Sequence, residues 1–309
     1  LTSSDTGPWA KGFRKSLYIR NGNQTSGAGA DDYAFIRTRL EAQDIANSGW
    51  DYTSTSSYIT LSFWVISSVA QNFFGHLVTS DGTQKQYPFE TGSLSANTWT
   101  KITKTIPGHA DLTFNNDNGT GIEIVIAPFF GTNLTANGAS VNTWAAQSDS
   151  ERMPDNTSTW WTTNDATFEI TGVQLEVGDT ASDFEHKRYS QELIDCQRYY
   201  FVAAKGQGSD NNGVPFCNGE SHNGSQFYGF IKFPTEMRAI PTLKHNDGTD
   251  YYTCYGNGGG DACDTIGQAR SQPNGFVVSV AGNLSLTQGT GSYARTSHDS
   301  ALVAFDAEL

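Results

Sequence analysis

Tryptophans and carboxylates are the residues in this sequence whose types could bind or cleave a sugar. Trp144, Trp160 and Trp161 lie in a polar stretch, residues 131–165, where a tryptophan has no evident place in a core. Aromatic rings stack on the apolar faces of sugar rings, while amides and carboxylates bind the hydroxyls. The three tryptophans are therefore the predicted glycan-binding residues.

Cleavage of a glycan would require two carboxylates at a fixed separation. The two carboxyl groups stand about 5 Å apart in retaining enzymes and about 6.5–9.5 Å apart in inverting enzymes. On a single strand, this separation requires two acidic residues at positions i and i+2, which share a face. Glu123 stands alone on its predicted strand, and Glu169 and Glu176 share a face only if Gly172 forms a bulge. No serine lies in a G-x-S-x-G nucleophile elbow. We therefore expect no catalytic residues and no enzyme activity.

Two short stretches gather oxygen atoms of the kind that calcium prefers. Asp117 lies in the Asn- and Gly-rich run 115–120, and Asp261 and Asp264 lie on either side of Cys263. The run 115–120 lacks the EF-hand spacing, and a polar hairpin turn explains it as well. A structural calcium ion is thus a weak prediction, and no other cofactor is expected.

The four cysteines all lie in the C-terminal part of the chain, at Cys196, Cys217, Cys254 and Cys263. Cys254 and Cys263 flank a glycine-rich loop, so a disulfide could cross a hairpin there. No C-x-x-C spacing supports zinc. We favour free thiols over a disulfide, and a disulfide over a metal site.

Charge and composition exclude two classes of partner. The 309 residues include 32 acidic and 19 basic side chains, giving a net charge of −13 with no basic run for nucleic-acid phosphates. No apolar stretch approaches the roughly 20 residues that a membrane span requires. Only 17% of residues are charged, and glycine occurs 32 times, which is typical of a turn-rich, all-β protein.

Strand-like alternation recurs every ten to fifteen residues in the first 180 positions. In residues 33–40, Tyr33, Phe35, Arg37 and Arg39 share one face, and the residues between them share the other. We expect one antiparallel β-sandwich. Its predicted strands are residues 16–20, 33–40, 58–67, 73–80, 99–106, 121–130 and 167–177.

The pattern changes near residue 186. Residues 189–197 predict a short helix with Ser190 as its N-cap, and a second β region follows. Its predicted strands are residues 197–203, 226–233, 249–255, 275–280, 284–288 and 301–307. The predicted organisation is a sandwich over 1–185, a connector with a short helix over 186–200, and a small C-terminal β domain over 201–309.

Residues 166–200 resemble a block that recurs in tail-fibre and receptor-binding proteins of tailed bacteriophages, common among marine and cyanobacterial phages. The block runs G-V-Q-L-E-x-G, then F-E, then E-L-x-x-C-Q-R-Y-Y, and the chain departs from it at Ser182-Asp183. The residues identified with this structural motif are Gly172, Gln174, Glu176, Phe184, Glu192, Cys196, Arg198, Tyr199 and Tyr200. The strand T-L-S-F-W-V at 60–65, the segment F-P-T-E-M-R-A-I-P-T at 233–242 and the chain end D-A-E-L at 306–309 resemble the same family.

The resemblance implies a jelly roll like a carbohydrate-binding module, followed by a small β domain that forms a homotrimer. It also implies a place on the virion exterior, after synthesis in the host cytoplasm, with other virion proteins and host surface polysaccharide as partners. The expected function is attachment as part of a tail fibre. A capsid fibre or decoration protein is the alternative, and a polysaccharide depolymerase is disfavoured because no carboxylate array is present.

Overall fold

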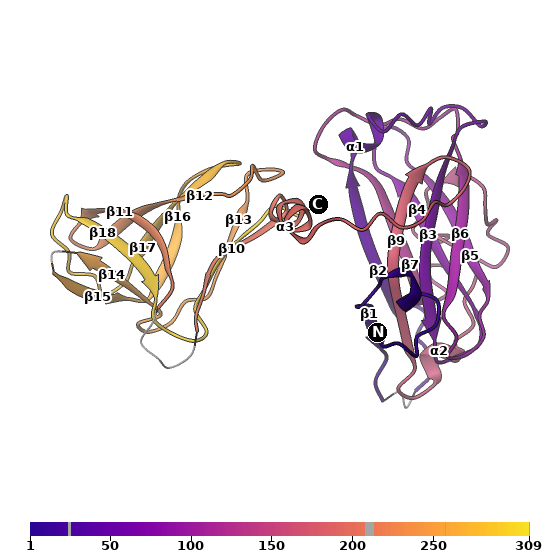
Figure 1. Ribbon diagram of the computed structural model, residues 1–309, viewed down its shortest axis with the longest axis horizontal. Helices are drawn as coiled ribbons and strands as arrows, with labels where there is room; N and C mark the ends of the chain where they lie inside the picture. Colours follow the sequence, from indigo (N-terminus) through magenta and orange to yellow (C-terminus); the bar gives the residue numbers. More distant parts are fainter. Residues whose placement is uncertain (24–25, 208–212, 257, 309) are drawn as a thin grey trace. The chain divides into compact units, whose positions relative to one another are not determined.

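The structure is a computed structural model of the chain that describes residues 1–23, 26–207, 213–256 and 258–308. Leu309 of the D-A-E-L terminus and Asn257 of the glycine-rich loop lie outside the described residues. The chain divides into two compact units, Leu1–Glu185 and His186–Leu309 (Figure 1). None of the helices found in the described ranges has the length and apolar character needed to cross a bilayer.

Unit 1 is a β-sandwich of two antiparallel sheets, as the alternation predicts. The first sheet has the order β1 (Leu17–Arg20), β9 (Thr167–Val177), β3 (Tyr58–Ser67), β6 (Thr100–Pro107). The second has the order β2 (Tyr33–Glu41), β7 (Thr120–Phe130), β4 (Asn72–Thr79), β5 (Lys85–Ser93), β8 (Ala145–Ala146). The remaining elements of unit 1 are the short helices η1 (Trp9–Lys11), α1 (Ala42–Ala46) and α2 (Thr159–Thr162).

Alternating residues of the two sheets form the core of unit 1. On β3, Ile59, Leu61, Phe63 and Val65 are buried in the cluster that also contains the inner residues of β7. Burial of each such side chain contributes about 1.5–3 kcal/mol. The sequence prediction missed β5, because Pro88 lacks a backbone donor and argues against a central strand. β5 tolerates the proline because its outer neighbour, β8, has two residues and pairs only with Lys85 and Gln86, so no ladder hydrogen bond to β8 is lost at Pro88.

Gly172 forms a bulge in β9, the condition under which Glu169 and Glu176 share a face. Its φ of 62° lies in the left-handed region, and the register to β3 shifts between Ser62 and Trp64. A Cβ atom at this position would stand 2.4 Å from the Phe13 ring. The bulge resets the alternation, so Ile170 and Val173 line the same cavity although they are three residues apart.

Unit 2 contains a larger and a smaller antiparallel sheet. The larger has the order β15 (Gly259–Cys263), β14 (Tyr252–Gly256), β18 (Gly291–Thr296), β11 (Pro215–Asn223), β12 (Gln226–Lys232), β17 (Gly275–Ala281), β16 (Thr265–Gln272). The smaller has the order β10 (Tyr200–Lys205), β19 (Leu302–Asp306), β13 (Thr242–His245). The helix α3 (Tyr189–Gln197) precedes β10, as predicted. The expected N-cap at Ser190 is wrong, because Arg188 is the N-cap and Ser190 lies within the helix.

The expected strand at 284–288 is wrong, because this segment is a loop. Leu284 is buried and Leu286 packs against the core, which produces the alternation in the sequence. The backbone N–H of Ser285 instead donates to the Asp261 carboxylate, and that of Leu286 donates to the Gly224 carbonyl. The loop thus covers the core without joining a ladder.

Candidate functional site

Trp160 is a core residue, which corrects its prediction as a glycan-binding residue. The side chain is fully buried, and its Nε1 donates to the Thr167 carbonyl at 3.0 Å. A buried ring with a satisfied N–H has no face to offer to a sugar. The polar residues around Trp160 in the sequence concealed its burial.

Trp144 and Trp161 do not form a shared platform either. Trp144 packs on Tyr87 at 5.2 Å between ring centroids, and its Nε1 donates to the Pro107 carbonyl at 2.7 Å. Trp161 packs on Phe129 at 5.1 Å. Pro107, the acceptor of Trp144, pairs with the first residue of β3. The acceptor of Trp160 is Thr167, and the next residue, Phe168, pairs with the last residue of β3. Ten strand residues span roughly 30 Å, so Trp144 lies at the opposite end of the sandwich from Trp160 and Trp161.

The calcium candidates all bind nearby donors of the protein. The carboxylate of Asp117 accepts from the N–H of Gly119, that of Asp261 from the N–H of Ser285, and that of Asp264 from the N–H of Asp250 and the amide of Asn283. Each contact fixes a turn or loop. In the described ranges, no three His, Cys, Asp or Glu side chains gather in a way that could hold a metal ion.

The four cysteines are free thiols. Cys254 and Cys263 lie on the paired strands β14 and β15 and are fully buried, whereas Cys196 is exposed. A hydrogen bond with Cys254, together with burial, raises the pKa of the Cys263 thiol. Burial raises the pKa of Cys217 to about 12. Cys217 and Cys263 are therefore protonated and poor nucleophiles.

Carboxylate geometry gives no support for glycoside cleavage. With the bulge at Gly172, Glu169 and Glu176 lie on one face of β9, opposite Ile66 and Thr60 of β3. Because Thr60 and Ile66 are six positions apart on β3, the two glutamates lie roughly 20 Å apart, well beyond the range of a catalytic pair. Glu169 accepts a hydrogen bond from Ser16, and Glu176 accepts two from Ser182.

Three aromatic rings form a ladder on the outer face of the second sheet. Tyr33 and Phe35 of β2 stand 5.5 Å apart between centroids, and Phe35 stacks on Phe130 of β7 at 5.5 Å. Tyr33 is 57% exposed, while Phe130 is buried. The alternation in residues 33–40 already placed Tyr33 and Phe35 on one face, but the sequence did not show that the face is open.

Charged groups continue this face along the same two strands. Arg39 Nε donates to Glu123 Oε2 at 2.9 Å, and Arg37 Nη1 lies 3.6 Å from the same oxygen. The Arg37 guanidinium carbon also lies 5.7 Å from the Phe35 ring centroid. We refer to Tyr33, Phe35, Arg37, Arg39 and Glu123 as the β2–β7 surface. It combines a stacking ring with donors and acceptors for hydroxyl groups.

The neighbouring part of the same face is covered by the segment 131–158. The Gln86 amide of β5 donates to the Glu151 carbonyl at 2.7 Å, and Met153 is buried against Val125 and Phe130. His76 lies beneath this cover, 2% exposed, and its Nδ1 makes no hydrogen bond. Burial, together with the charge of Arg152, lowers the pKa of His76 to about 3, so the imidazole is neutral.

The motif residues of unit 1 bind one another. The Gln174 side chain accepts from the N–H of Glu185 at 2.9 Å and donates to Glu176 at 2.9 Å. Phe184 contacts Phe13 edge-to-face at 4.8 Å, on the ring that Gly172 also faces. These contacts hold the segment after β9 against that strand and Phe13.

The motif residues of unit 2 connect its helix and strands. The Arg198 carbonyl accepts from the N–H of Arg238, and the Tyr199 carbonyl accepts from the N–H of Ala307, both at 2.8 Å. Tyr200 starts β10 and pairs with Asp306. Glu192 and Cys196 are exposed on α3.

Comparisons with known proteins add little to this picture. No protein-family model matches the chain, and no curated protein matches it. Among solved structures, the T=1 Penaeus vannamei nodavirus structure aligns over 94% of this chain and 96% of that chain, at 11% identity and a TM-score of 0.17. A TM-score this low gives no basis for assigning a function.

Proposed function

We propose that the chain is a non-enzymatic structural protein of a bacteriophage virion, part of a tail fibre that attaches to glycans on the host surface. The observation that carries this proposal is that the separate segments resembling tail-fibre proteins meet in space. The strand at 60–65 pairs with the G-V-Q-L-E strand in unit 1. In unit 2, Arg238 from the segment 233–242 joins Arg198 to the chain end at Ala307.

The β2–β7 surface is the glycan site of this proposal. Tyr33 provides an exposed ring, and Arg37, Arg39 and Glu123 provide hydrogen-bonding groups beside it. Such a surface is shallow, so a single copy would bind weakly. Several copies on one fibre would raise the strength of attachment without new contacts.

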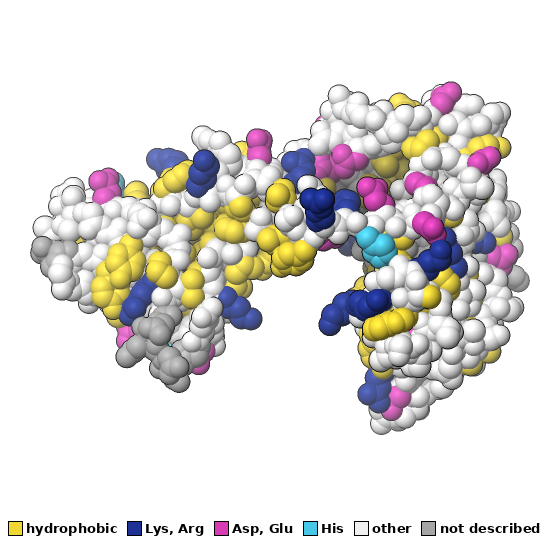
Figure 2. Space-filling view, viewed as in Figure 1, with side chains coloured by type: hydrophobic (Ala, Val, Ile, Leu, Met, Phe, Trp, Pro, Cys, Tyr) yellow, Lys and Arg dark blue, Asp and Glu magenta, His cyan; other side chains and the backbone are white. Residues whose placement is uncertain are grey.

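Exposed apolar side chains on unit 2 support self-association, which we propose is a trimer. Figure 2 shows hydrophobic side chains gathered near α3, β10 and β13. Among the described residues, most of the exposed large hydrophobic side chains belong to unit 2: Tyr189, Leu193, Ile194, Tyr200, Val202, Phe230, Ile240 and Tyr293. Closed symmetry would bury such a surface without leaving an open sticking face.

Electron microscopy of labelled particles tests the proposal. Gold-tagged antibodies against the chain, applied to phage particles that carry its gene, should mark fibres at the tail. Labels on the capsid would contradict the tail-fibre role and favour a capsid fibre or decoration protein. In parallel, purified chain mixed with host polysaccharide should leave the polymer length unchanged, and shortening would favour a depolymerase.

A further inference from the structure

An apolar cavity of about 650 Å³ opens at one edge of the sandwich, between the two sheets of unit 1. It exists because β1 pairs with β9 only as far as Ile170. Beyond that residue, no described strand continues beside β9 on this side. The inner side chains of β9 and β2 are therefore left uncovered: Val173 is 37% exposed.

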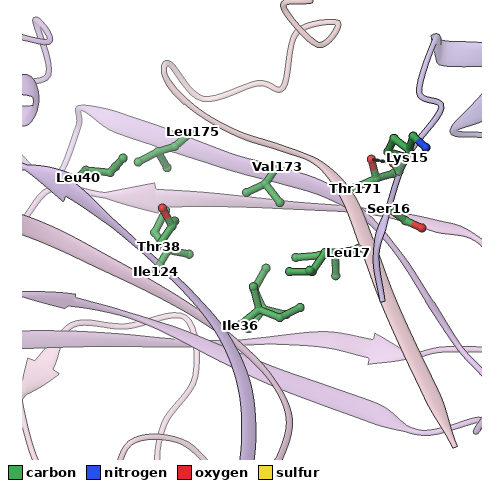
Figure 3. Close-up of a pocket in the computed structure, with 12 residues that line it drawn as sticks. Lys15, Ser16, Leu17, Ile36, Thr38, Leu40, Ile124, Thr171, Val173 and Leu175 are labelled. Atoms are coloured by element: carbon green, nitrogen blue, oxygen red, sulfur yellow. Dashed lines mark hydrogen bonds between the residues drawn. The ribbon is translucent and has the colours of Figure 1, made fainter. Parts of the chain in front are cut away.

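The walls and floor of the cavity are aliphatic over most of its length. Val173 and Leu175 come from β9, Ile36 and Leu40 from β2, and Ile124 from β7 (Figure 3). Ligand cavities typically measure about 300–1,000 Å³ and are mainly apolar with a few placed polar groups. This cavity has that size and that character.

Three of the four polar lining residues lie together at one end of the cavity, and the fourth is Thr38 of β2. Figure 3 shows Lys15, Ser16 and Thr171 at one end of the cavity, and Leu40 and Leu175 at the other. The Thr171 hydroxyl donates to the Lys15 carbonyl at 2.8 Å, and the Ser16 hydroxyl donates to Glu169 at 2.7 Å. The Lys15 ammonium group has no ion-pair partner in the described parts of the chain. It is the cation available at this end, since the neighbouring Arg14 guanidinium binds backbone carbonyls and covers Trp9.

We propose that this cavity binds a single alkyl chain whose anionic head group lies at Lys15. The hydrocarbon would cover Val173, Leu17 and the aliphatic walls, which favours binding by about 25 cal/mol per Å² of apolar surface removed from water. A sugar does not fit this cavity, because each hydroxyl buried without a partner costs about 1–3 kcal/mol. This site is separate from the β2–β7 surface, and the proposal does not depend on the tail-fibre role.

Calorimetric titration of the full chain with dodecanoate, below its micelle-forming concentration, tests the proposal. We expect saturable binding of one dodecanoate per chain, and about tenfold weaker binding of dodecyltrimethylammonium, which carries the opposite charge. Lys15→Glu should reverse this preference, whereas Lys232→Glu, at an exposed position in unit 2, should leave it unchanged. Equal affinity for both head groups in the wild type and in Lys15→Glu would overturn the assignment of the head group.

Variants that fill the cavity test its location. Thr38→Phe and Val173→Phe place a ring in the cavity from β2 and β9 and should abolish dodecanoate binding. Val177→Phe, on the same strand but outside the cavity lining, is the matched control and should bind like the wild type. Melting temperatures of all three variants show whether they fold. Unchanged binding in folded Thr38→Phe and Val173→Phe, or no saturable binding in the wild type, would overturn the proposal.

Co-sedimentation with vesicles distinguishes the two sources of such a ligand. Binding to phosphatidylglycerol vesicles that is lost in Val173→Phe would identify a lipid acyl chain. Binding of dodecanoate without vesicle binding would identify a free amphiphile. Both results support an alkyl-chain site, and they differ only in where the chain comes from.

Discussion

Arg238 Nε donates a hydrogen bond to the backbone carbonyl of Ala307 at 2.7 Å, and a second guanidinium nitrogen donates to the Glu308 carbonyl at 3.0 Å. Its backbone N–H also binds the Arg198 carbonyl. One residue thus joins the end of α3, the segment before β13 and the end of the chain. Hydrogen bonds from a charged donor contribute about 1.5–3 kcal/mol each.

Arg238→Ala should therefore lower the free energy of unfolding by about 1.5–3 kcal/mol, because the partly buried Ala307 carbonyl loses its charged donor, while the bond to the Glu308 carbonyl is exposed and contributes little. Urea denaturation followed by tyrosine fluorescence and circular dichroism measures this change. Arg270→Ala is the control, since Arg270 donates only to the adjacent Ala269 carbonyl at an exposed site. Equal losses in both variants would argue against a special role for Arg238.

Trp160→Ala should destabilise unit 1 by about 3–5 kcal/mol, because it leaves a large cavity in the core. Tyr33→Ala should change stability by less than about 0.5 kcal/mol, since the Tyr33 ring is mostly exposed. Thermal unfolding of both variants measures the difference. Similar melting temperatures for Trp160→Ala and the wild type would contradict the burial of this residue.

Tyr33→Ala should also weaken retention of the chain by polysaccharide extracted from the host, because the stacking ring of the β2–β7 surface is lost. Affinity electrophoresis measures the retention. Tyr18→Ala removes an exposed tyrosine from the other sheet and should retain normal binding. Equal retention of the two variants would locate the glycan site elsewhere.

His76 should make the stability of the chain fall in acid. Its pKa in the folded state is about 3, below the ordinary value of 6.5, so the unfolded chain takes up a proton first as the pH falls. The free energy of unfolding should decrease from about pH 6.5 towards pH 3, by at most about 1.4 kcal/mol per pH unit from this group. His76→Gln should flatten the profile over that range, and an unchanged slope in this variant would contradict the role of His76.

Only one of the four thiols should react with Ellman's reagent in the native chain. Cys196 is exposed, while the other three are buried and the pKa values of Cys217 and Cys263 are raised. Absorbance should report one equivalent in buffer, four in denaturant, and none for native Cys196→Ser. Only two equivalents in denaturant would instead reveal a disulfide.

Light scattering should report a mass near three times 33.5 kDa for the full chain. Replacing Leu193 and Ile194 with serine should reduce this mass, because the exposed apolar face of α3 supplies part of the proposed contact. Tyr18→Ser removes an exposed aromatic residue from unit 1 and should leave the mass unchanged. A monomeric wild type at micromolar concentration would refute the trimer.

Sequence patterns alone predict the all-β class, the strands β3, β7 and β9, a bulge at Gly172 and the helix α3. These features are local: period-two alternation and a glycine that breaks the period each lie within about ten residues. Strands without clean alternation, such as β11, β16 and β18, were not predicted, because polar residues and glycine interrupt their buried faces.

Which side chains are buried and which are exposed follows from the packing of distant segments, not from local sequence. Trp160 and Tyr33 are both aromatic residues in polar surroundings, yet one is buried between the sheets and the other is exposed at a sheet edge. The contact of Arg238 with Ala307 joins residues 69 positions apart. Likewise, the cavity beside Val173 exists because β1 ends early. Burial and edge exposure depend on partners distant in sequence, and no local pattern encodes them.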